Sequence, residues 1–247
     1  MIYIIYTFIL GTLFGSFILV FSTRALKGED YIKSRSYCES CHQNLKWYNL
    51  IPLISYIFQK GKCSNCKAKI PFITFLIELI TGLLFAYMFY LYGLSYDFFI
   101  GIIISCLLIN ICITDFKEYI ILNEPLILST ILIIALMIYY HDLNFLLLHL
   151  ATGFMIFGFF LLTKKIGDIL FKRESLGGGD IKFSFIIGLI LGFQLSLNAV
   201  ILSTFLALPT SVAALKISKN REIPYGPFLV GALLLVFLNA DKFYIII

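Results

Sequence analysis

Two aspartates, Asp115 and Asp180, stand at the edges of long apolar segments, where an ionisable side chain is costly. Asp115 occurs in TDFKEYIILN and Asp180 in GGGDIKF, 65 residues further along the chain. Two carboxylates at close range can share one proton, because both cannot ionise cheaply in a low dielectric. One then serves as base and the other as acid, which is what water activation on a peptide carbonyl requires. The pair therefore indicates an aspartic hydrolase.

Three glycines, residues 177–179, directly precede Asp180. Glycine adopts backbone conformations closed to other residues and leaves no side chain in the way. We therefore expect an extended substrate to approach the carboxylate here, with a helix beginning at Asp180. From the residue pattern alone two plainer roles stay open: Asp180 as a helix N-cap after a flexible loop, and Asp115 as an ordinary charge at a helix end.

Four cysteines form two C-x2-C pairs within the hydrophilic segment 24–71, Cys38 with Cys41 and Cys63 with Cys66. Four thiolates offer a tetrahedral zinc site, and the spacing fits a zinc ribbon. With all four ligand positions filled, the ion would be structural, holding together a loop that has little core of its own. Two disulfides or four free thiols are the alternative, and a cytosolic position argues against disulfides.

The elements that must position these residues are membrane-spanning helices. The chain has 247 residues, of which 60% are hydrophobic and 13% charged, and a soluble domain of this size could not hide so much apolar surface. Spans of about 20 mostly apolar residues are expected. The candidates are residues 2–23, 72–93, 98–114, 125–140, 145–163, 183–194, 198–215 and 227–240. We therefore predict an all-α integral membrane protein with about eight transmembrane helices, or seven if 183–215 is one interrupted element, and a small cytosolic zinc-ribbon-like insertion.

The lysines and arginines predict the orientation in the membrane. With eight spans and the N-terminus outside, every basic residue except Lys242 falls on the cytosolic side. Both aspartates and the cysteine loop then share that side. A nucleic-acid surface is the weaker interpretation of the net charge of +5, because the basic residues are spread over several loops. The first span has no cleavage motif, so we expect it to be retained.

The predicted organisation has three parts: the first transmembrane helix at 1–23, the cytosolic tetracysteine zinc loop at 24–71, and a polytopic membrane domain at 72–247 that carries both aspartates. Other hydrolytic chemistries fit poorly. The chain has no H-E-x-x-H zinc motif, no G-x-S-x-G elbow, and neither a P-loop nor a dinucleotide fingerprint.

Six segments, in order, resemble the motifs of the bacterial type IV leader peptidases, the prepilin peptidases of the intramembrane aspartic protease group. They are GSFILVFSTR; the cysteine motifs RSYCESC and KCSNC, with NLIPLISY between them; FLIELITG; TDFKEYIILN; GGGDIKF, which carries the G-x-G-D signature; and IPYGPFLVGA. Leu19 stands where the family usually has asparagine, and Leu122 where it usually has proline. The similarity runs nearly end to end.

The resemblance implies an enzyme of the bacterial cytoplasmic membrane that removes the short basic leader from type IV prepilins or pseudopilins at the cytosolic face. Asp115 and Asp180 would activate water without a covalent intermediate. The family also implies methylation of the new N-terminal amine with S-adenosylmethionine. Glu78 and Gly82 match residues tied to that methyl transfer.

Two other classes of protein would use the same residues differently. A transporter or proton channel would use the paired carboxylates to carry ions or protons. A zinc-ribbon membrane scaffold would recruit a secretion ATPase through the cysteine loop. A peptidase without methyltransferase activity is a further alternative. The implied partners are a prepilin-like precursor and the lipid bilayer, with no nucleic acid, and no pattern in the chain indicates an oligomeric state.

Overall fold

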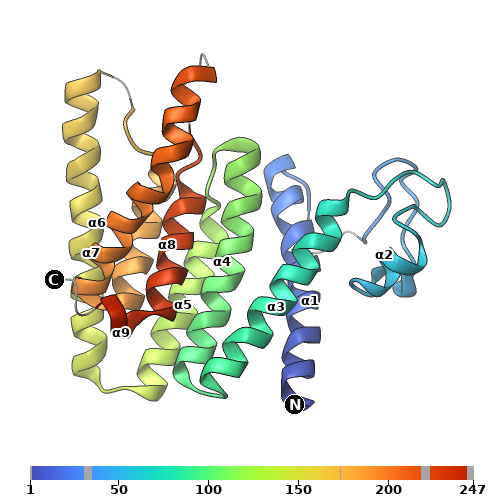
Figure 1. Cartoon of the computed structure of the whole chain (residues 1–247), viewed down its shortest axis with the longest axis horizontal. Coiled ribbons are helices and arrows are strands. Elements are labelled where there is room, and N and C mark those ends of the chain that lie inside the picture. The colour runs from blue at the N-terminus through green and yellow to red at the C-terminus, as the bar shows by residue number, and fades with distance from the viewer. Residues whose placement is uncertain (1, 31–34, 173, 218–222, 244–247) are drawn as a thin grey trace. The chain divides into compact units, whose positions relative to one another are not determined.

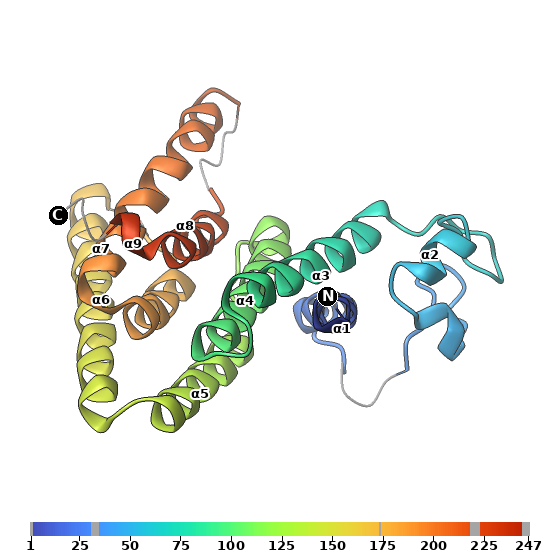
Figure 2. The same cartoon turned by 60° about the horizontal axis from the view of Figure 1, so that its bottom comes forward.

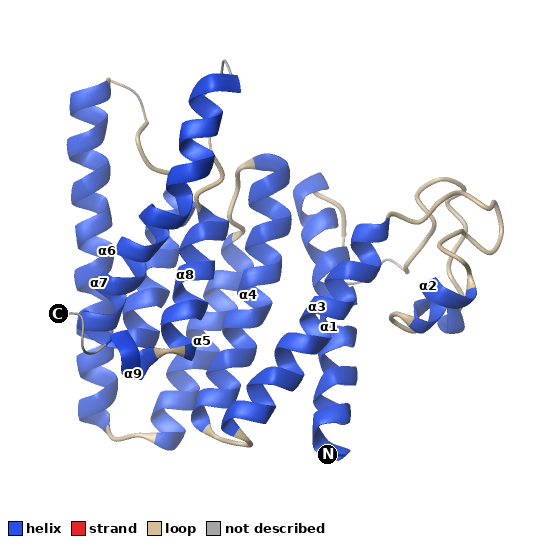
Figure 3. Cartoon of the chain, in the orientation of Figure 1, coloured by secondary structure: helices blue, strands red, loops and turns tan. Residues whose placement is uncertain are grey.

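The computed structural model describes residues 2–30, 35–172, 174–217 and 223–243, which form helices joined by short connections (Figure 1). Within these ranges there is no strand, only two isolated β-bridges in the cysteine loop (Figure 3). Six of the described helices are long and apolar enough to cross a membrane: α1 (Ile2–Lys27), α3 (Phe72–Tyr92), α4 (Tyr96–Glu118), α5 (Asn123–Tyr140), α6 (Leu143–Phe171) and α7 (Gly178–Ile217). The predicted all-α membrane protein is thereby confirmed.

The chain divides into two compact units, residues 1–98 and 99–247. The three-part organisation inferred from the sequence stays a prediction. Its zinc loop includes residues 31–34, and its membrane domain includes 173, 218–222 and 244–247, all of which lie outside the described residues. Unit 1 contains α1, α3 and the cysteine loop, whereas unit 2 contains both aspartates.

In unit 1, α1 and α3 pack closely because glycines line their contact (Figure 2). A Cβ added at Gly11 would lie 2.7 Å from the carbonyl oxygen of Thr81, and one added at Gly15 would lie 2.7 Å from the Thr81 hydroxyl. From the other side, a Cβ on Gly82 would lie 2.7 Å from Thr12 Cγ2. Small residues spaced four apart let two membrane helices approach in this way.

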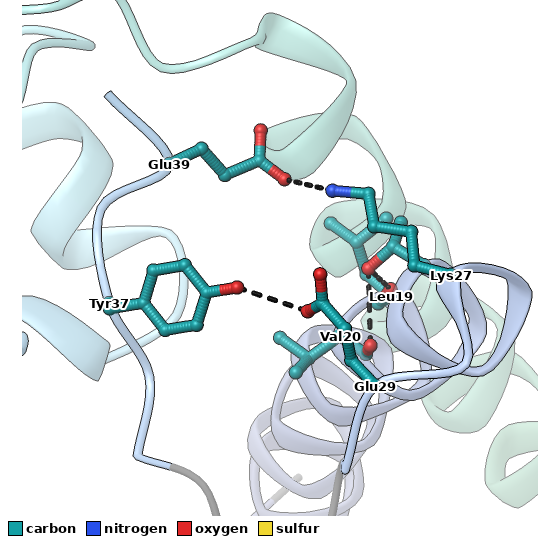
Figure 4. A network of polar contacts seen from close by, with 7 residues as sticks. Leu19, Val20, Lys27, Glu29, Tyr37 and Glu39 are labelled. Atoms are coloured by element: carbon teal, nitrogen blue, oxygen red, sulfur yellow. Dashed lines mark hydrogen bonds and ion pairs between the residues drawn. The ribbon is translucent and has the colours of Figure 1, made fainter. Parts of the chain in front are cut away.

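The end of α1 is tied to the cysteine loop by a polar network (Figure 4). Lys27 Nζ lies 3.2 Å from Glu39 Oε1, and the Tyr37 hydroxyl donates to Glu29 Oε2 at 3.0 Å. The buried Arg24 guanidinium lies 5.2 Å from the centre of the Tyr37 ring. Exposed ion pairs contribute about 0–1 kcal/mol each, so the buried Arg24 contact is the more substantial anchor.

Two short helices, η1 (Trp47–Leu50) and α2 (Ile54–Phe58), lie within the cysteine loop. The Tyr56 ring of α2 packs on Phe72 and Phe75 in the first turn of α3, with ring centres 6.4 and 5.3 Å apart. Leu53, just before α2, has a positive φ of 59°, and its N–H donates to Glu78 Oε2 at 2.8 Å. The loop is therefore fastened to the side of α3.

In unit 2, α7 packs against α6 and the short helix α8 (Gly226–Leu238). The contact with α6 is close because two glycines meet. A Cβ on Gly188 would lie 2.7 Å from the Gly153 Cα. A one-turn helix, α9 (Ala240–Phe243), follows α8. The first turn of α7 carries Asp180, and the start of α8 contacts Asp115, so this packing forms the part of unit 2 that contains both aspartates.

Helix α7 bends sharply at Gly192, whose φ of 72° and ψ of −179° are accessible only to glycine. The Ser196 hydroxyl donates to the carbonyl oxygen of Ile187 at 3.1 Å. Nine residues of straight helix would separate these groups by about 13 Å. The two halves of α7 therefore fold back on each other. The spans predicted at 183–194 and 198–215 correspond to the two halves of α7, and the bend at Gly192 comes slightly earlier than the expected break.

Two predicted boundaries differ from the structure near the aspartates. Helix α4 continues past the predicted end at residue 114 to Glu118, so Asp115 lies in its last turn rather than after it. Helix α7 begins at Gly178, so Asp180 is in its first turn and two of the three glycines are helical. The apolar pattern could not show these extensions, because it marks only the apolar part of a helix, and the helix itself continues beyond that part.

Candidate active site

Asp115 is held by the start of helix α8. Its side chain is buried, and its Oδ2 accepts a hydrogen bond of 2.9 Å from the backbone N–H of Gly226. Gly226 is the first residue of α8, whose N-terminal N–H groups and dipole favour negative charge. The approach depends on glycine, since a Cβ there would lie 2.9 Å from the same carboxylate oxygen and 2.9 Å from Ile111 Cγ2.

Asp180 is buried in the first turn of α7. Its Oδ2 lies beside Gly177, where an added Cβ would be only 3.0 Å away. Its Oδ1 is shielded from solvent and has no hydrogen-bond partner among the described residues. Burying a polar atom without a partner is costly, so such an atom in a native fold calls for a functional explanation. This oxygen is free to bind a water molecule or a substrate group.

Ile121, in the connection between α4 and α5, joins the two sites. A Cβ on Gly179, next to Asp180, would lie 2.7 Å from Ile121 Cβ. A Cβ on Gly226, which holds Asp115, would lie 3.1 Å from Ile121 Cδ1. Both glycines therefore rest on one side chain, and the two carboxylates are close enough to interact electrostatically. The fold thus brings together the two aspartates that the sequence places 65 residues apart.

Tyr225 and Ser203 extend this site, and the sequence analysis gave neither of them a role. The Tyr225 and Ser203 hydroxyl oxygens lie 2.6 Å apart, and Ser203 is fully buried in the second half of α7. Tyr225 immediately precedes Gly226 and interacts electrostatically with Asp180. The hydrogen bond therefore fixes the turn that presents the Gly226 N–H to Asp115. In the sequence, the only indication of a role for Tyr225 is its place in the motif IPYGPFLVGA, and this motif does not show that Ser203 is its partner.

A second hydrogen bond fixes the start of α7 from another side. The Lys182 ammonium donates to Asn123 Oδ1 at 2.7 Å, which links the first turns of α7 and α5. Since Ile121 lies two residues before Asn123, this contact also holds the connection on which Gly179 rests. The first turn of α7 is thus located by both packing and polar contacts.

The four cysteines of unit 1 converge on one point. All four sulfur atoms lie within 4.8 Å of one another, and Cys38 Sγ is 3.8 Å from Cys66 Sγ. A tetrahedral zinc ion with bonds of 2.3 Å to sulfur requires sulfur atoms about 3.8 Å apart. The residues present therefore fit a metal of this kind. The tetracysteine cluster predicted from the two C-x2-C pairs can hold a zinc ion.

The two cysteine pairs sit in matching turns. The His42 N–H donates to the carbonyl oxygen of Cys38 at 2.8 Å, and the Lys67 N–H donates to that of Cys63 at 3.1 Å. His42 and Lys67, each four residues after the first cysteine of a pair, have φ values of 54° and 61°. Backbone N–H groups of Cys66 and Asn65 lower the pKa of the Cys63 thiol to about 6. At Cys63 the turn thereby favours the thiolate form that binds metal.

The two methyl-transfer candidates lie at the contact of α1 and α3. Glu78 is buried, and its carboxylate accepts hydrogen bonds from the Leu53 N–H and the Ser16 side chain. Gly82 has no space beside it, because Thr12 and Phe8 occupy the volume that a side chain would need. Gly82 therefore acts in this fold as a packing residue, and Glu78 fastens the cysteine loop to the helices.

Comparison with known proteins defines the class. Residues 9–92 match the bacterial peptidase A24 N-terminal domain, and residues 102–212 match the type IV leader peptidase family. The chain belongs to the type IV leader peptidase family, which confirms the resemblance drawn from the six motifs. The cysteine loop falls in the first match and both aspartates in the second.

Particular relatives carry the name prepilin leader peptidase/N-methyltransferase. One from Bacillus subtilis is 31% identical over 250 residues, which cover 96% of this chain and 96% of the relative. One from Vibrio cholerae is 30% identical over 217 residues, covering 85% of this chain and 83% of the relative. One from Myxococcus xanthus is 26% identical over 236 residues, which cover 91% of this chain and 69% of the relative. No solved structure matches the chain.

Proposed function

We propose that Asp115 and Asp180 are the catalytic pair of a membrane-embedded aspartic endopeptidase that removes the leader from type IV prepilin-like precursors. Family membership and the nearly full-length match to prepilin leader peptidase/N-methyltransferases support this substrate class. The observation that carries the proposal is the convergence of two buried carboxylates, one of which has an unpartnered oxygen. Neither aspartate has an ion-pair partner among the described salt bridges, so charge pairing does not explain the arrangement.

The surroundings of the two carboxylates support a different role for each of them. The Gly226 N–H and the start of α8 favour negative charge on Asp115, which suits it to accept a proton from water. Asp180 also accepts a backbone hydrogen bond from Gly177, but its Oδ1 has no donor among the described residues, which suits Asp180 to carry a proton. As the water oxygen bonds to the scissile carbonyl carbon, its proton passes to Asp115. Asp180 then protonates the departing amine as the peptide bond breaks, and no covalent enzyme intermediate forms.

The glycines just before and within the first turn of α7 support access of a substrate to this pair. Gly178 has open space around the position of a Cβ, and a Cβ on Gly177 would lie 3.0 Å from Asp180 Oδ2. A side chain at Gly177 would crowd the carboxylate oxygen, whereas glycine leaves the backbone of a substrate free to approach. The scissile peptide can therefore reach the carboxylates in an extended conformation.

The enzyme is also an N-methyltransferase by family, and we assign this activity to unit 1. S-adenosylmethionine would supply the methyl group that is transferred to the new N-terminal amine. Glu78 would act from the contact of α1 and α3, either by binding the amine or by holding the loop, and Gly82 by permitting the close approach of the helices. A structural zinc ion would be held by Cys38, Cys41, Cys63 and Cys66.

The proposed topology has eight crossings, with the N-terminus outside and the active site at the cytosolic face of the bacterial cytoplasmic membrane. The bend at Gly192 supports it by turning α7 into two passes, and α8 supplies a further apolar helix of 13 residues. Labelling of single cysteines introduced at exposed positions on each side tests it. Labelling of residues 141 and 242 from the cytosol would contradict the orientation.

The experiment that tests the proposed function uses purified protein in detergent, one prepilin and S-adenosylmethionine. The intact mass of the product shows both reactions. We expect the prepilin to lose its leader, and to gain one methyl group only when S-adenosylmethionine is present. A reaction without the protein is the control. Charge movement in liposomes without any shortened product from several prepilins would favour a transporter instead.

A further inference from the structure

The cysteine loop carries an exposed apolar surface that neither the aspartates nor the sulfur cluster uses. It is formed by residues of η1 and α2 and is called here the η1–α2 patch. Its members are Trp47, Tyr48, Leu50, Ile54, Ile57 and Phe58. Trp47 is 77% exposed and Phe58 is 83% exposed, so most of the surface of these two rings is uncovered. Because η1 and α2 contact each other, these exposed apolar side chains belong to one part of the surface, and a large exposed apolar area marks an interaction site.

The position of the patch relative to α3 indicates what covers it. The Leu53 N–H, between η1 and α2, donates to Glu78 Oε2 at 2.8 Å. Glu78 is six residues beyond Phe72, the first residue of α3, and so lies about 9 Å along that helix. In Figure 1, α2 accordingly lies at the height of the N-terminal half of α3. The patch is therefore beside the first turns of a membrane-spanning helix rather than beyond its end.

The packing of α2 leaves its apolar side chains facing away from the protein. Tyr56 turns toward α3 and contacts Phe72 and Phe75. Ile57 and Phe58, the next two residues, are exposed. At the depth of the first turns of α3, the surroundings of an outward-facing side chain are lipid headgroups and the upper part of the acyl chains. Tryptophan and tyrosine are enriched at this level in membrane proteins.

The charge of the loop favours an anionic lipid surface. No aspartate or glutamate occurs between Glu39 and Glu78, whereas five lysines do, at positions 46, 60, 62, 67 and 69. Lys46 and Lys60 flank the patch in sequence, and the Lys46 ammonium lies 5.8 Å from the centre of the Tyr48 ring. Lysines near a membrane surface are attracted by anionic headgroups.

We propose that the η1–α2 patch docks into the headgroup region of the anionic leaflet on the side of the membrane where α1 ends and α3 begins. Trp47 and Phe58 insert among the lipids, and the flanking lysines contact anionic headgroups. The sulfur cluster and Glu78 hold the patch at this depth. The proposal concerns lipid contact alone, so it stands whether or not the assigned catalytic roles are correct.

Trp47 supplies the test, because it is the only tryptophan in the chain and its fluorescence reports on the patch without a label. The full-length protein is reconstituted into vesicles of phosphatidylcholine and phosphatidylglycerol, with or without brominated acyl chains, which quench tryptophan on contact. We expect strong quenching by the brominated lipid and weak quenching by acrylamide in the water. Strong quenching by acrylamide with none by brominated lipid would overturn the proposal.

Variants test the two components of the docking. Replacing Phe58 by Ser should lower lipid quenching of Trp47 at least about twofold, because it removes one of the two most exposed aromatic rings of the patch. Leu128→Ser, at a similarly exposed position on α5 in unit 2, should leave the quenching unchanged. The triple variant Lys46→Gln, Lys60→Gln, Lys62→Gln should abolish the difference between anionic and wholly phosphatidylcholine vesicles.

Other occupants of the patch give different results. If a prepilin substrate covers it, Trp47 is accessible to acrylamide in vesicles and becomes protected only when the prepilin is added. If a second copy of the chain covers it, protection increases with the density of protein in the vesicle and is independent of lipid bromination. Either result would overturn docking to the leaflet.

Discussion

Gly226→Ala is expected to impair peptide cleavage by displacing a single backbone group. In the structure the Gly226 N–H donates to Asp115 Oδ2 at 2.9 Å. A Cβ at this position would lie 2.9 Å from that oxygen, 2.9 Å from Ile111 Cγ2 and 3.1 Å from Ile121 Cδ1. The added Cβ would thus be too close to two apolar side chains and to the carboxylate. The start of α8 must therefore move away from Asp115, and the hydrogen bond from the residue 226 N–H to Asp115 must lengthen.

The magnitude follows from the hydrogen bond that is lost. A hydrogen bond to a charged group contributes about 1.5–3 kcal/mol, and each 1.4 kcal/mol in a barrier is about tenfold in rate. If Asp115 acts as the base, kcat/KM for prepilin cleavage should therefore fall about 10- to 100-fold. Methylation of a prepilin that has already been cleaved should be retained, because the changed residue belongs to unit 2 and the candidate methyl-transfer residues to unit 1.

The assay compares initial rates of prepilin cleavage by wild type, Gly226→Ala and Gly231→Ala. Gly231 is the matched control, since it is a glycine of the same helix with nothing within 4 Å of an added Cβ. Thermal unfolding of each variant shows whether the fold is intact. A Gly226→Ala enzyme within twofold of wild type, or an equal loss with Gly231→Ala, would refute the reasoning.

Three further predictions concern other contacts. Tyr225→Phe removes the hydrogen bond to Ser203, and kcat should fall about 3- to 10-fold with KM unchanged, as steady-state kinetics would show; a change in KM alone would contradict a positioning role. Cys63→Ser should abolish binding of one zinc ion per chain, measured by elemental analysis, and reduce methylation more than cleavage; full zinc content would exclude the cysteine site. Gly192→Ala places a side chain at a φ of 72°, so calorimetry should show that the free energy of unfolding falls by about 1–3 kcal/mol. Gly158→Ala, where an added Cβ meets open space, should cause no such loss of stability.

Features that depend on short-range spacing could be predicted from the sequence. The two C-x2-C pairs required only that two turns bring four sulfur atoms together, and the sulfur atoms lie within 4.8 Å of one another. Long apolar segments likewise predicted the membrane helices. The aspartates were recognisable as candidates because a carboxylate beside an apolar segment is unusual. Their convergence followed only from the expected topology.

The contacts that shape the active site could not be predicted, because they join segments distant in sequence. The Gly226 N–H meets Asp115 across 111 residues, and Ser203 meets Tyr225 between two helices. The side chain of Ile121, on which Gly179 and Gly226 both rest, is apolar and carries no signal of such a role. The polarity of the sequence predicts the bend of α7 after residue 194, slightly later than Gly192, because the position of the bend depends on the backbone conformation of Gly192 rather than on polarity.

Gly82 shows how a motif can be recognised while its physical role stays hidden. The sequence connected it with methyl transfer through resemblance alone. In the structure its missing side chain admits Thr12 and Phe8 of α1. We infer that it acts on methylation by keeping α1 and α3 together.

The central claim is that Asp115 and Asp180 together activate water, and the most direct measurement is the cleavage rate of one prepilin by Asp115→Asn and Asp180→Asn. Asp142→Asn, which changes an exposed aspartate before α6, is the control. We predict that each catalytic substitution lowers kcat/KM by about 10²- to 10⁴-fold, as expected for loss of a general acid or base, while the control retains the wild-type rate. Wild-type rates for either catalytic variant would contradict the claim.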